Sequence, residues 1–323
     1  MTTGVRRRLG LGLAALARPA YITAGRSRDL GGDRAVEALR SRTSELLDVA
    51  YRHDVRYLDV ARSYGRAEEF LAGWLAGHPG ADDVLIGSKW GYRYVGGWRT
   101  DAEVHEVHEV KDHSPEAFVD QYGQTRALLG GRLAVYQVHS ATPDTGVLDD
   151  TELHRVLAGL RADGVALGIS TSGPAQADAV RRALEVRVDG EPLFTSIQST
   201  WNVLEPSVGD ALAEAADDGA YVIVKEAVAN GRLTDHGVDG PAAARVAALA
   251  ERLELRTDQL ALAAVLAQPW AWQVLSGAVT PAQLESNLAA EDIRLPPDVL
   301  AELADLAEPA GEYWAARSRR PWN

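Results

Sequence analysis

The chain has 323 residues, of which 46% are hydrophobic and 24% charged, a balance typical of a soluble globular protein. Its formal net charge of −13, from 33 basic and 46 acidic residues, argues against nucleic-acid binding, because a polyanion needs a basic surface. The absence of cysteine excludes disulfides and cysteine-ligated zinc.

The N-terminus combines arginines with a short apolar run at residues 9–17 and thereby faintly resembles a signal peptide. Two glycines interrupt this run, which merges into a second apolar piece at 20–24, so we expect a strand instead. No apolar run in the sequence approaches the roughly 18 residues that a membrane span requires. We therefore expect a cytoplasmic protein without a membrane partner.

Helix-like and strand-like segments alternate along the rest of the chain. Short, mostly apolar runs predict strands near 57–59, 84–88, 133–138, 165–170, 193–198, 221–224 and 273–275. Apolar residues at helical spacing predict helices at 37–52, 67–76, 115–129, 150–162, 174–187, 206–216, 242–253, 258–266 and 281–290. Ser114 followed by Pro115 is a favourable helix start, with serine as the cap and proline in the first turn.

Together with the N-terminal strand, these segments predict one α/β domain over residues 1–323, a (β/α)8 TIM barrel of about eight strand–helix units. A doubly wound open sheet is the alternative. Residues 90–113 break the alternation, carry several aromatic residues and follow a strand, so we expect a long aromatic loop over the C-terminal mouth that contacts substrate. Residues 308–323 form a C-terminal tail.

Four polar residues stand at or just after the ends of predicted strands, namely Asp59, Tyr64, Lys89 and His139. The strands of a parallel barrel point the same way, so their C-terminal ends converge on one mouth. There Asp59 can hold Lys89, Lys89 can lower the pKa of the Tyr64 phenol, and His139 can orient a substrate oxygen. These groups predict a proton-transfer site.

Lysine is rare in this chain, and Lys89 and Lys225 both end apolar strand-like runs. A lysine kept at such a place is expected to serve through its compact, tunable ammonium group.

Several motifs in chain order resemble the aldo-keto reductase family. Residues 58–68 are similar to its signature, 87–89 to the strand with its catalytic lysine, and 136–139 to the strand with its histidine. The resemblance implies a barrel that reduces aldehydes or ketones with NADP(H) or NAD(H). It implies that Tyr64 donates a proton to the carbonyl oxygen, that Lys89 and Asp59 tune it, and that His139 positions the carbonyl.

The resemblance also implies the cofactor residues. Ser170, Thr171 and Gln198 stand where the family binds the carboxamide, and Trp201 where an aromatic ring stacks on the nicotinamide. Gly277, Gln283 and Asn287 belong to a segment similar to the one that grips the phosphates and the adenine.

Two departures from the family pattern leave the choice between NAD and NADP open. The segment after the last strand lacks the cation with which NADP-preferring members hold the 2′-phosphate, and a phosphate without a cation loses its strongest partner. Lys225 and Glu226 replace the usual Ser-Pro pair. Lys225 could reach a cofactor phosphate, whereas Glu226 could accept a ribose hydroxyl.

The aromatic residues Trp90, Tyr92, Trp98 and Trp314 are the expected substrate contacts, and they suggest a partly apolar or planar carbonyl compound. We expect no metal, because the histidines at 105–113 lack the zincin spacing, and no Rossmann loop, because the glycines at 10–15 lack the third glycine. A cofactor-binding regulatory barrel with little turnover and a metal-dependent barrel hydrolase remain as alternatives. The substrate, the reaction direction and the oligomeric state cannot be read from the sequence.

Overall fold

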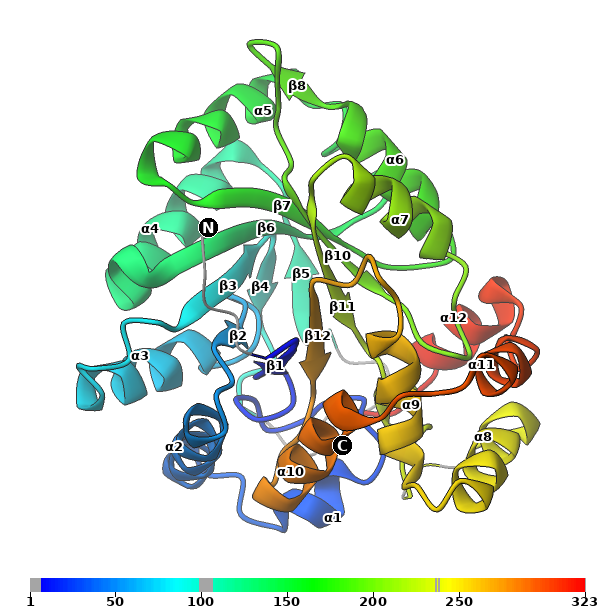
Figure 1. Ribbon diagram of the computed structural model, residues 1–323. Coiled ribbons are helices and arrows are strands. Elements are labelled where there is room, and N and C mark those ends of the chain that lie inside the picture. Colours follow the sequence, from blue (N-terminus) through cyan, green and yellow to red (C-terminus); the bar gives the residue numbers. More distant parts are fainter. Residues whose placement is uncertain (1–6, 99–106, 236, 238, 323) are drawn as a thin grey trace.

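The computed structural model describes residues 7–98, 107–235, 237 and 239–322. Eight parallel strands close into a barrel in the order β1-β12-β11-β10-β7-β6-β3-β2 (Figure 1). They are Leu9–Gly12 (β1), Tyr57–Asp59 (β2), Leu85–Trp90 (β3), Leu133–Ala141 (β6), Ala166–Thr171 (β7), Ser196–Thr200 (β10), Tyr221–Lys225 (β11) and Gln273–Ser276 (β12). The predicted (β/α)8 fold class is confirmed, and the open-sheet alternative is wrong.

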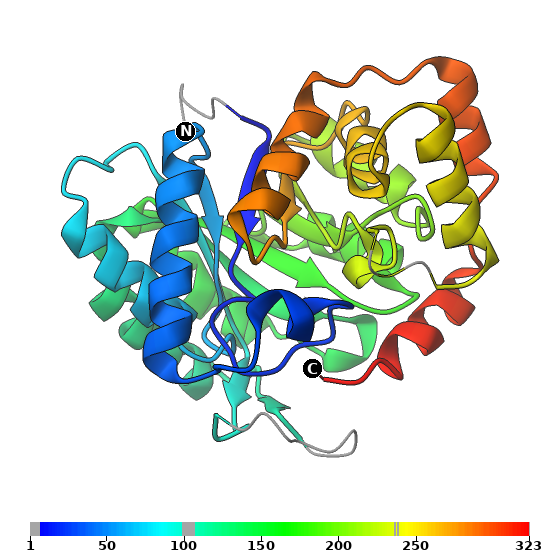
Figure 2. The ribbon, with the colours of Figure 1, turned by 90° about the horizontal axis from the view of Figure 1, so that it is seen from below.

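Helices surround this barrel on the outside (Figure 2). They are Arg26–Leu30 (α1), Val36–Arg52 (α2), Ala67–Gly77 (α3), Pro115–Leu129 (α4), Thr151–Ala158 (α5), Gln176–Glu185 (α6), Gly209–Asp217 (α7), Pro241–Arg252 (α8), Thr257–Leu266 (α9), Pro281–Ala289 (α10), Pro297–Ala304 (α11) and Ala310–Ser318 (α12). The Ser114 hydroxyl caps α4 by accepting from the Ala117 amide at 3.2 Å, as the sequence predicts. The helix expected at 150–162 is α-helical only to Ala158 and continues as a 3-10 turn at Gly159–Asp163.

The barrel interior is filled by side chains at the N-terminal end and carries polar groups at the C-terminal end. Tyr57, Val135, Ile223 and Leu275 pack together inside. Gly87 makes room for this packing, because a Cβ there would lie 2.2 Å from the Tyr57 hydroxyl. In register, Asp59 pairs with Gly87 and Lys89 pairs with Gln137, so Lys89 and His139 each lie two residues beyond the partner of the preceding polar strand end.

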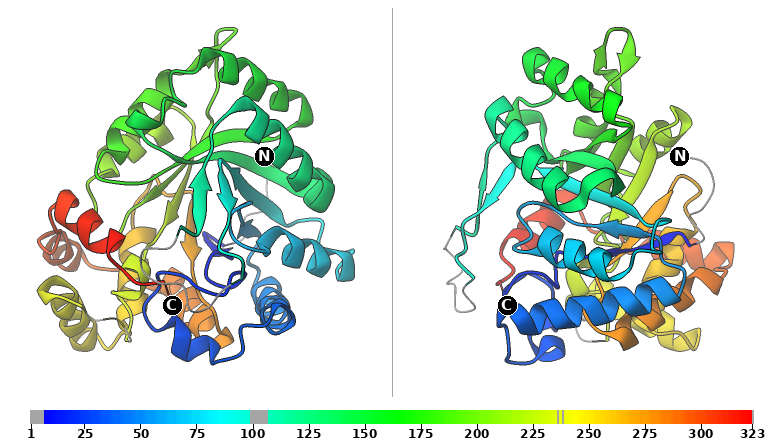
Figure 3. Two further views of the ribbon diagram at one scale, coloured as in Figure 1. Left: turned by 180° about the vertical axis from the view of Figure 1, so that it is seen from behind. Right: turned by 90° about the vertical axis from the view of Figure 1, so that its left-hand side faces the viewer.

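An antiparallel hairpin of Tyr92–Tyr94 (β4) and Glu109–Lys111 (β5) follows β3. Figure 3 shows this hairpin on the same side of the molecule as the loop before α1 and the segment after α12. The predicted aromatic loop is therefore a hairpin in its described part, and residues 99–106 lie outside the described residues. Over the described ranges, no helix is both long and apolar enough to cross a bilayer.

Candidate active site

The structure brings Asp59, Tyr64, Lys89 and His139 together at the C-terminal mouth of the barrel. The Lys89 ammonium donates to Asp59 Oδ1 at 2.5 Å and to the Val60 carbonyl at 3.0 Å. Its nitrogen lies 4.9 Å from the centre of the Tyr64 ring. The His139 ring packs edge-on against Tyr64, with 5.5 Å between ring centres. All four residues are buried, so the cluster is screened from bulk water.

Gln198 on β10 completes this cluster. Its side-chain nitrogen donates to Asp59 Oδ2 at 2.8 Å, so each oxygen of the Asp59 carboxylate has a donor. Its own Oε1 is buried and has no hydrogen-bond partner among the described residues. A buried acceptor without a donor is costly, and it marks a place where a ligand N–H can be accommodated.

Burial dominates the electrostatics of Tyr64. It raises the pKa of the Tyr64 phenol well above its usual range, and the Asp59 carboxylate raises it further, whereas Arg18 lowers it. The Lys89 ammonium, which is expected from the sequence to lower this pKa, is paired directly with Asp59. The phenol is consequently protonated at neutral pH, which is the form that can donate a proton.

His139 is arranged as a neutral hydrogen-bonding group. Burial lowers the pKa of its imidazole well below the usual range, and the charges of Lys89 and Arg18 lower it further. Its Nδ1 lies 3.4 Å from the Ser63 hydroxyl. Within the described residues, neither its Nε2 nor the Tyr64 hydroxyl forms a hydrogen bond. Both groups are therefore available to one substrate oxygen.

Three cavities that share lining residues run past this cluster. A cavity of about 100 Å³ is lined by Asp59, Tyr64, Gln198 and Gly277. It shares Gly277, Thr23 and Gly231 with a second cavity of about 70 Å³, where Gln283 and Asn287 lie. On its other side it shares Tyr21, Tyr64, Lys225 and Glu226 with a third, the mouth cavity of about 230 Å³, which His139 also lines. Three adjoining cavities, called the path below, thus lie between His139 and Asn287.

The predicted phosphate- and adenine-binding segment lies at the far end of this path. Gln283 donates to Asp29 at 2.7 Å and accepts from the Val279 amide at 2.9 Å, and the Asn287 amide lies 2.8 Å from the Ser276 hydroxyl.

A cation that the sequence reasoning missed, Arg256, also lines the second cavity. It forms ion pairs with Asp235 at 2.8 Å and Asp258 at 3.2 Å. Arg256 precedes α9 and belongs to no motif, so only the folded chain places it there.

Lys225 and Glu226 both line the path, and each already has a partner. The Lys225 ammonium donates to the Thr200 hydroxyl at 2.7 Å, and burial lowers its pKa to about 8 in spite of the nearby Glu226. Burial by itself would raise the pKa of Glu226, but Arg317 and Lys225 lower it to about 2. The Glu226 carboxylate is paired with Arg317 of α12 and with Asn230, so the C-terminal helix is tied to the end of β11.

Three of the predicted cofactor residues lie outside these cavities. Ser170 accepts from the Ser140 amide at 2.9 Å, and the Thr171 hydroxyl lies 2.7 Å from that of Ser199. Trp201 packs into the core edge-on against Trp270, with 5.6 Å between ring centres. Trp201 therefore does not line these cavities, and its stacking on a nicotinamide stays a prediction.

Of the predicted substrate contacts, only Tyr92 lines the mouth cavity, where its ring lies 5.0 Å from that of His139. Trp90 is buried against Phe118 of α4, because neighbouring residues of a strand point to opposite faces and Lys89 points inward.

Trp98 and Trp314 also lie away from the mouth cavity. Trp98 packs against Phe70 and donates to the Arg34 carbonyl at 2.9 Å. Trp314 is buried and donates to Glu205 at 3.2 Å. Trp90, Trp98 and Trp314 therefore do not line the mouth cavity, contrary to what direct substrate contact would require there.

The mouth cavity has further walls that the sequence reasoning did not identify. They come from the loop after β1, from the hairpin and from the end of the chain, and they include Arg18, Tyr21, Glu109, Arg317, Arg320 and Trp322. The Trp322 ring stacks on His108 at 4.3 Å and packs edge-on against Tyr21 at 6.0 Å. The tail does contribute an aromatic wall, but through Trp322 rather than Trp314.

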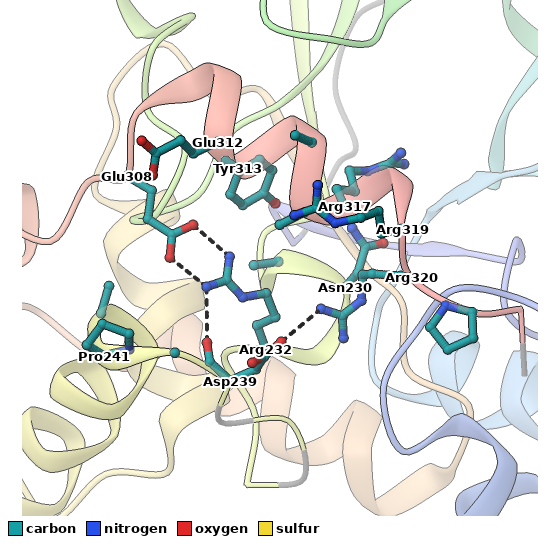
Figure 4. A pocket seen from close by; sticks show the side chains of 16 residues that line it. Asn230, Arg232, Asp239, Pro241, Glu308, Glu312, Tyr313, Arg317, Arg319 and Arg320 are labelled. Carbon is teal, nitrogen blue, oxygen red and sulfur yellow. Dashed lines mark hydrogen bonds and ion pairs between the residues drawn. The ribbon is translucent and has the colours of Figure 1, made fainter.

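A groove of about 810 Å³ lies between α12 and the segment around Gly240 and shares Arg317 and Arg320 with the mouth cavity (Figure 4). Arg232 forms two hydrogen bonds to Glu308 and one to the Asp239 carbonyl, and Arg320 lies 3.8 Å from the Asp239 carboxylate. These pairs join the residues on either side of α12 to the segment between β11 and α8. The groove contains none of the four clustered residues, so we do not assign it to the site.

Comparisons with known proteins agree with this geometry. A sequence profile described as the Aldo/keto reductase family matches residues 29–308. Protein tas from Escherichia coli (strain K12) is 26% identical over 309 residues, which cover 80% of this chain and 86% of that protein.

Solved structures share the fold. The glycerol dehydrogenase AKR11B4 from Gluconobacter oxydans aligns with a TM-score of 0.68 at 22% identity, covering 95% of this chain and 94% of that one. The holo form of the aldo-keto reductase AKR11C1 from Bacillus halodurans aligns with a TM-score of 0.66 at 21% identity, covering 94% and 93%. The profile match spans most of the chain, and the chain therefore belongs to the aldo/keto reductase family.

Proposed function

We propose that this protein reduces an aldehyde or ketone with NADPH or NADH, or catalyses the reverse oxidation of an alcohol, with Tyr64 as the proton donor. The observation that carries the proposal is the row of three adjoining cavities between His139 and Asn287 with the buried cluster of Asp59, Tyr64 and Lys89 beside it. An elongated ligand in this path would bring one end to the proton donor.

The residues along the path fit a nicotinamide dinucleotide. The orphaned Oε1 of Gln198 can accept from a carboxamide N–H, and Lys225 supplies a cation midway along the path. Gln283, Asn287 and Arg256 offer polar groups at the far end, where an adenosine would lie. When bound, the nicotinamide supplies the hydride.

The chain's own residues handle the proton. The protonated Tyr64 hydroxyl donates to the carbonyl oxygen as negative charge develops on it, and neutral His139 donates a second hydrogen bond that orients the carbonyl. Lys89 and Asp59 hold each other at 2.5 Å and fix the electrostatic environment of the phenol. Burial of the cluster keeps these interactions strong, because the local dielectric is low.

Turnover separates this function from a regulatory barrel that binds cofactor without reacting. Purified protein should oxidise NADH or NADPH only when a reactive small aldehyde is present. The fall in absorbance of the reduced nicotinamide measures this oxidation. The same protein should bind either cofactor in a fluorescence titration. Cofactor binding with no oxidation across a panel of aldehydes and ketones would favour the regulatory role.

We expect cofactor discrimination to be weak or to favour NADH. The second cavity is lined by more acidic than basic residues, so a 2′-phosphate there meets more negative than positive charge. The basic residues are Arg26 and Arg256, and the acidic residues are Asp29, Asp235 and Asp258. Comparing kcat/KM for NADH and NADPH under identical conditions measures this. A preference for NADPH beyond about a hundredfold, roughly 2.7 kcal/mol, would contradict the prediction.

If that preference is found, Arg256→Ala should remove most of it. The control is Arg252→Ala, at the exposed end of α8, where the arginine pairs with Glu302 away from the cavity.

Cofactor affinity should fall as the pH rises through 8. Lys225 has a pKa of about 8, so its ammonium is largely present at pH 7 and largely lost at pH 9. If that charge helps to hold a cofactor phosphate, the dissociation constant should rise by up to about tenfold over this range. In Lys225→Met the affinity should be lower at pH 7 and nearly independent of pH. An unchanged affinity in this variant would remove Lys225 from cofactor binding.

A further inference from the structure

An arginine stacks on the proposed proton donor. Arg18, in the loop after β1, is only 2% exposed, yet it lines the mouth cavity. The centre of its guanidinium lies 4.8 Å from the centre of the Tyr64 ring and 4.3 Å from that of Tyr21. An arginine this close to a reacting group acts on whatever ligand reaches Tyr64.

Arg18 is fixed in orientation and retains a free donor. Its Nε donates to the Ala14 carbonyl at 2.9 Å, and its Nη1 donates to Glu109 Oε1 of β5 at 2.9 Å. Among the described residues, Nη2 donates to no protein atom. The guanidinium is thus held on one side, while a donor on the other side is left for a ligand, with little rotamer entropy to lose on binding.

The mouth cavity is positive although the chain is strongly acidic. Its wall carries four basic residues, Arg18, Lys225, Arg317 and Arg320, against the two acids Glu109 and Glu226. Both acids are already engaged, Glu109 by Arg18 and Glu226 by Arg317. In a protein with a net charge of −13, such a concentration of cations in one enclosed place favours an anionic ligand.

We propose that the substrate is an aldehyde or ketone with a carboxylate a few bonds from its carbonyl group, and that Arg18 binds that carboxylate. This inference rests on the proposed carbonyl reduction. The carbonyl oxygen lies at Tyr64 and His139, and the carboxylate accepts a hydrogen bond from Arg18. Because Arg18 contacts the Tyr64 ring, the carbonyl and the carboxylate of the substrate must lie close together. The planar fork of a guanidinium matches a carboxylate, and the cavity of about 230 Å³ suits a compact molecule.

Two matched ligands test the proposal on the full chain. They are 3-carboxybenzaldehyde and its neutral methyl ester, which share the ring and the reacting aldehyde. Calorimetry measures the affinity of each with and without either oxidised cofactor, and steady-state kinetics with each reduced cofactor gives kcat/KM. We expect the acid to be preferred over the ester at least tenfold in both measurements. Glyceraldehyde 3-phosphate compared with glyceraldehyde shows whether a phosphate is preferred instead, which would overturn the choice of a carboxylate.

Three variants locate the preference. Arg18→Gln should bring the acid-to-ester ratio close to one. Glu109→Gln removes the carboxylate that competes for Arg18, so it should raise the ratio at least threefold. The control is Arg93→Gln in β4 of the same hairpin. Arg93 is exposed, pairs with Asp112 and does not line the cavity. The acid-to-ester ratio of this variant should equal that of the unmodified protein.

The outcomes separate this inference from the proposed reaction. Equal use of acid and ester by the unmodified protein would overturn the inference while leaving the reductase function in place. An equal loss for both ligands in Arg18→Gln, with no change in Glu109→Gln, would show that Arg18 only supports the loop. If the protein binds the acid in preference to the ester through Arg18 but reduces neither ligand, the proposed reaction is refuted and the anion-binding site is supported.

Discussion

Tyr64→Phe is expected to lower kcat by about 100-fold or more, because general acid catalysis by a positioned side chain contributes roughly 10²–10⁴-fold. The Tyr64 hydroxyl forms no hydrogen bond among the described residues, so its removal should not destabilise the fold. Cofactor affinity should also stay within about threefold, since the ring and its packing remain. Steady-state rates with a reactive aldehyde, combined with a cofactor titration, measure both effects.

The control for this experiment is Tyr122→Phe. Tyr122 lies on α4, where its hydroxyl donates to Asp163 at 2.6 Å, far from the cluster. This variant loses the same atom and should keep its full rate. Retention of more than about a tenth of kcat in Tyr64→Phe would contradict a proton donor that contributes the usual factor.

Lys89→Met is expected to abolish most of the activity and to destabilise the protein. Lys89 is 0% exposed and is paired with Asp59, so the substitution leaves a buried carboxylate without its cation, which costs about 3–5 kcal/mol. The same unpaired charge acts on Tyr64, whose pKa Asp59 already raises. Any residual activity should therefore have its alkaline limb shifted to higher pH.

The double variant Asp59→Asn, Lys89→Met distinguishes folding from chemistry. It removes both charges of the pair, so stability should recover relative to Lys89→Met, while activity should stay low. Thermal unfolding and pH–rate profiles of the three proteins provide the measurements. A Lys89→Met protein with an unchanged pH–rate profile would remove Lys89 from the mechanism.

The convergence of the four clustered residues could be predicted because it depends on local patterns and one topological rule. Each strand is short and apolar, which predicts burial on both faces, and parallel strands in a closed barrel end at the same mouth. Asp59, Lys89 and His139 stand on β2, β3 and β6 as expected, and Tyr64 follows the first of these. The fold class and the four clustered residues could therefore be predicted from patterns that each extend over a few residues.

The side to which each aromatic residue points was predicted less well, although part of the signal was present. Lys89 and Trp90 are neighbours on β3, so only one of them can point into the barrel. The same alternation places Gln198 beside Asp59 and turns Trp201, three positions later, into the core. The presence of a tryptophan at a strand end does not show whether a ligand can reach it. The alternation of side chains along the strand decides that.

By itself, the sequence determined the barrel, the strand ends and the chemical groups at its mouth, because alternating patterns and strand polarity act over a few residues. Only the tertiary structure decided what surrounds those groups. Arg18, Glu109 and Trp322 meet at the mouth from segments far apart in the chain, and Arg256 joins Asn287 at the other end of the path. Only the tertiary structure likewise shows that the Lys89 ammonium pairs directly with Asp59. Burial and long-range contacts set the charge and shape of a cavity, and neither is encoded in the spacing of a motif.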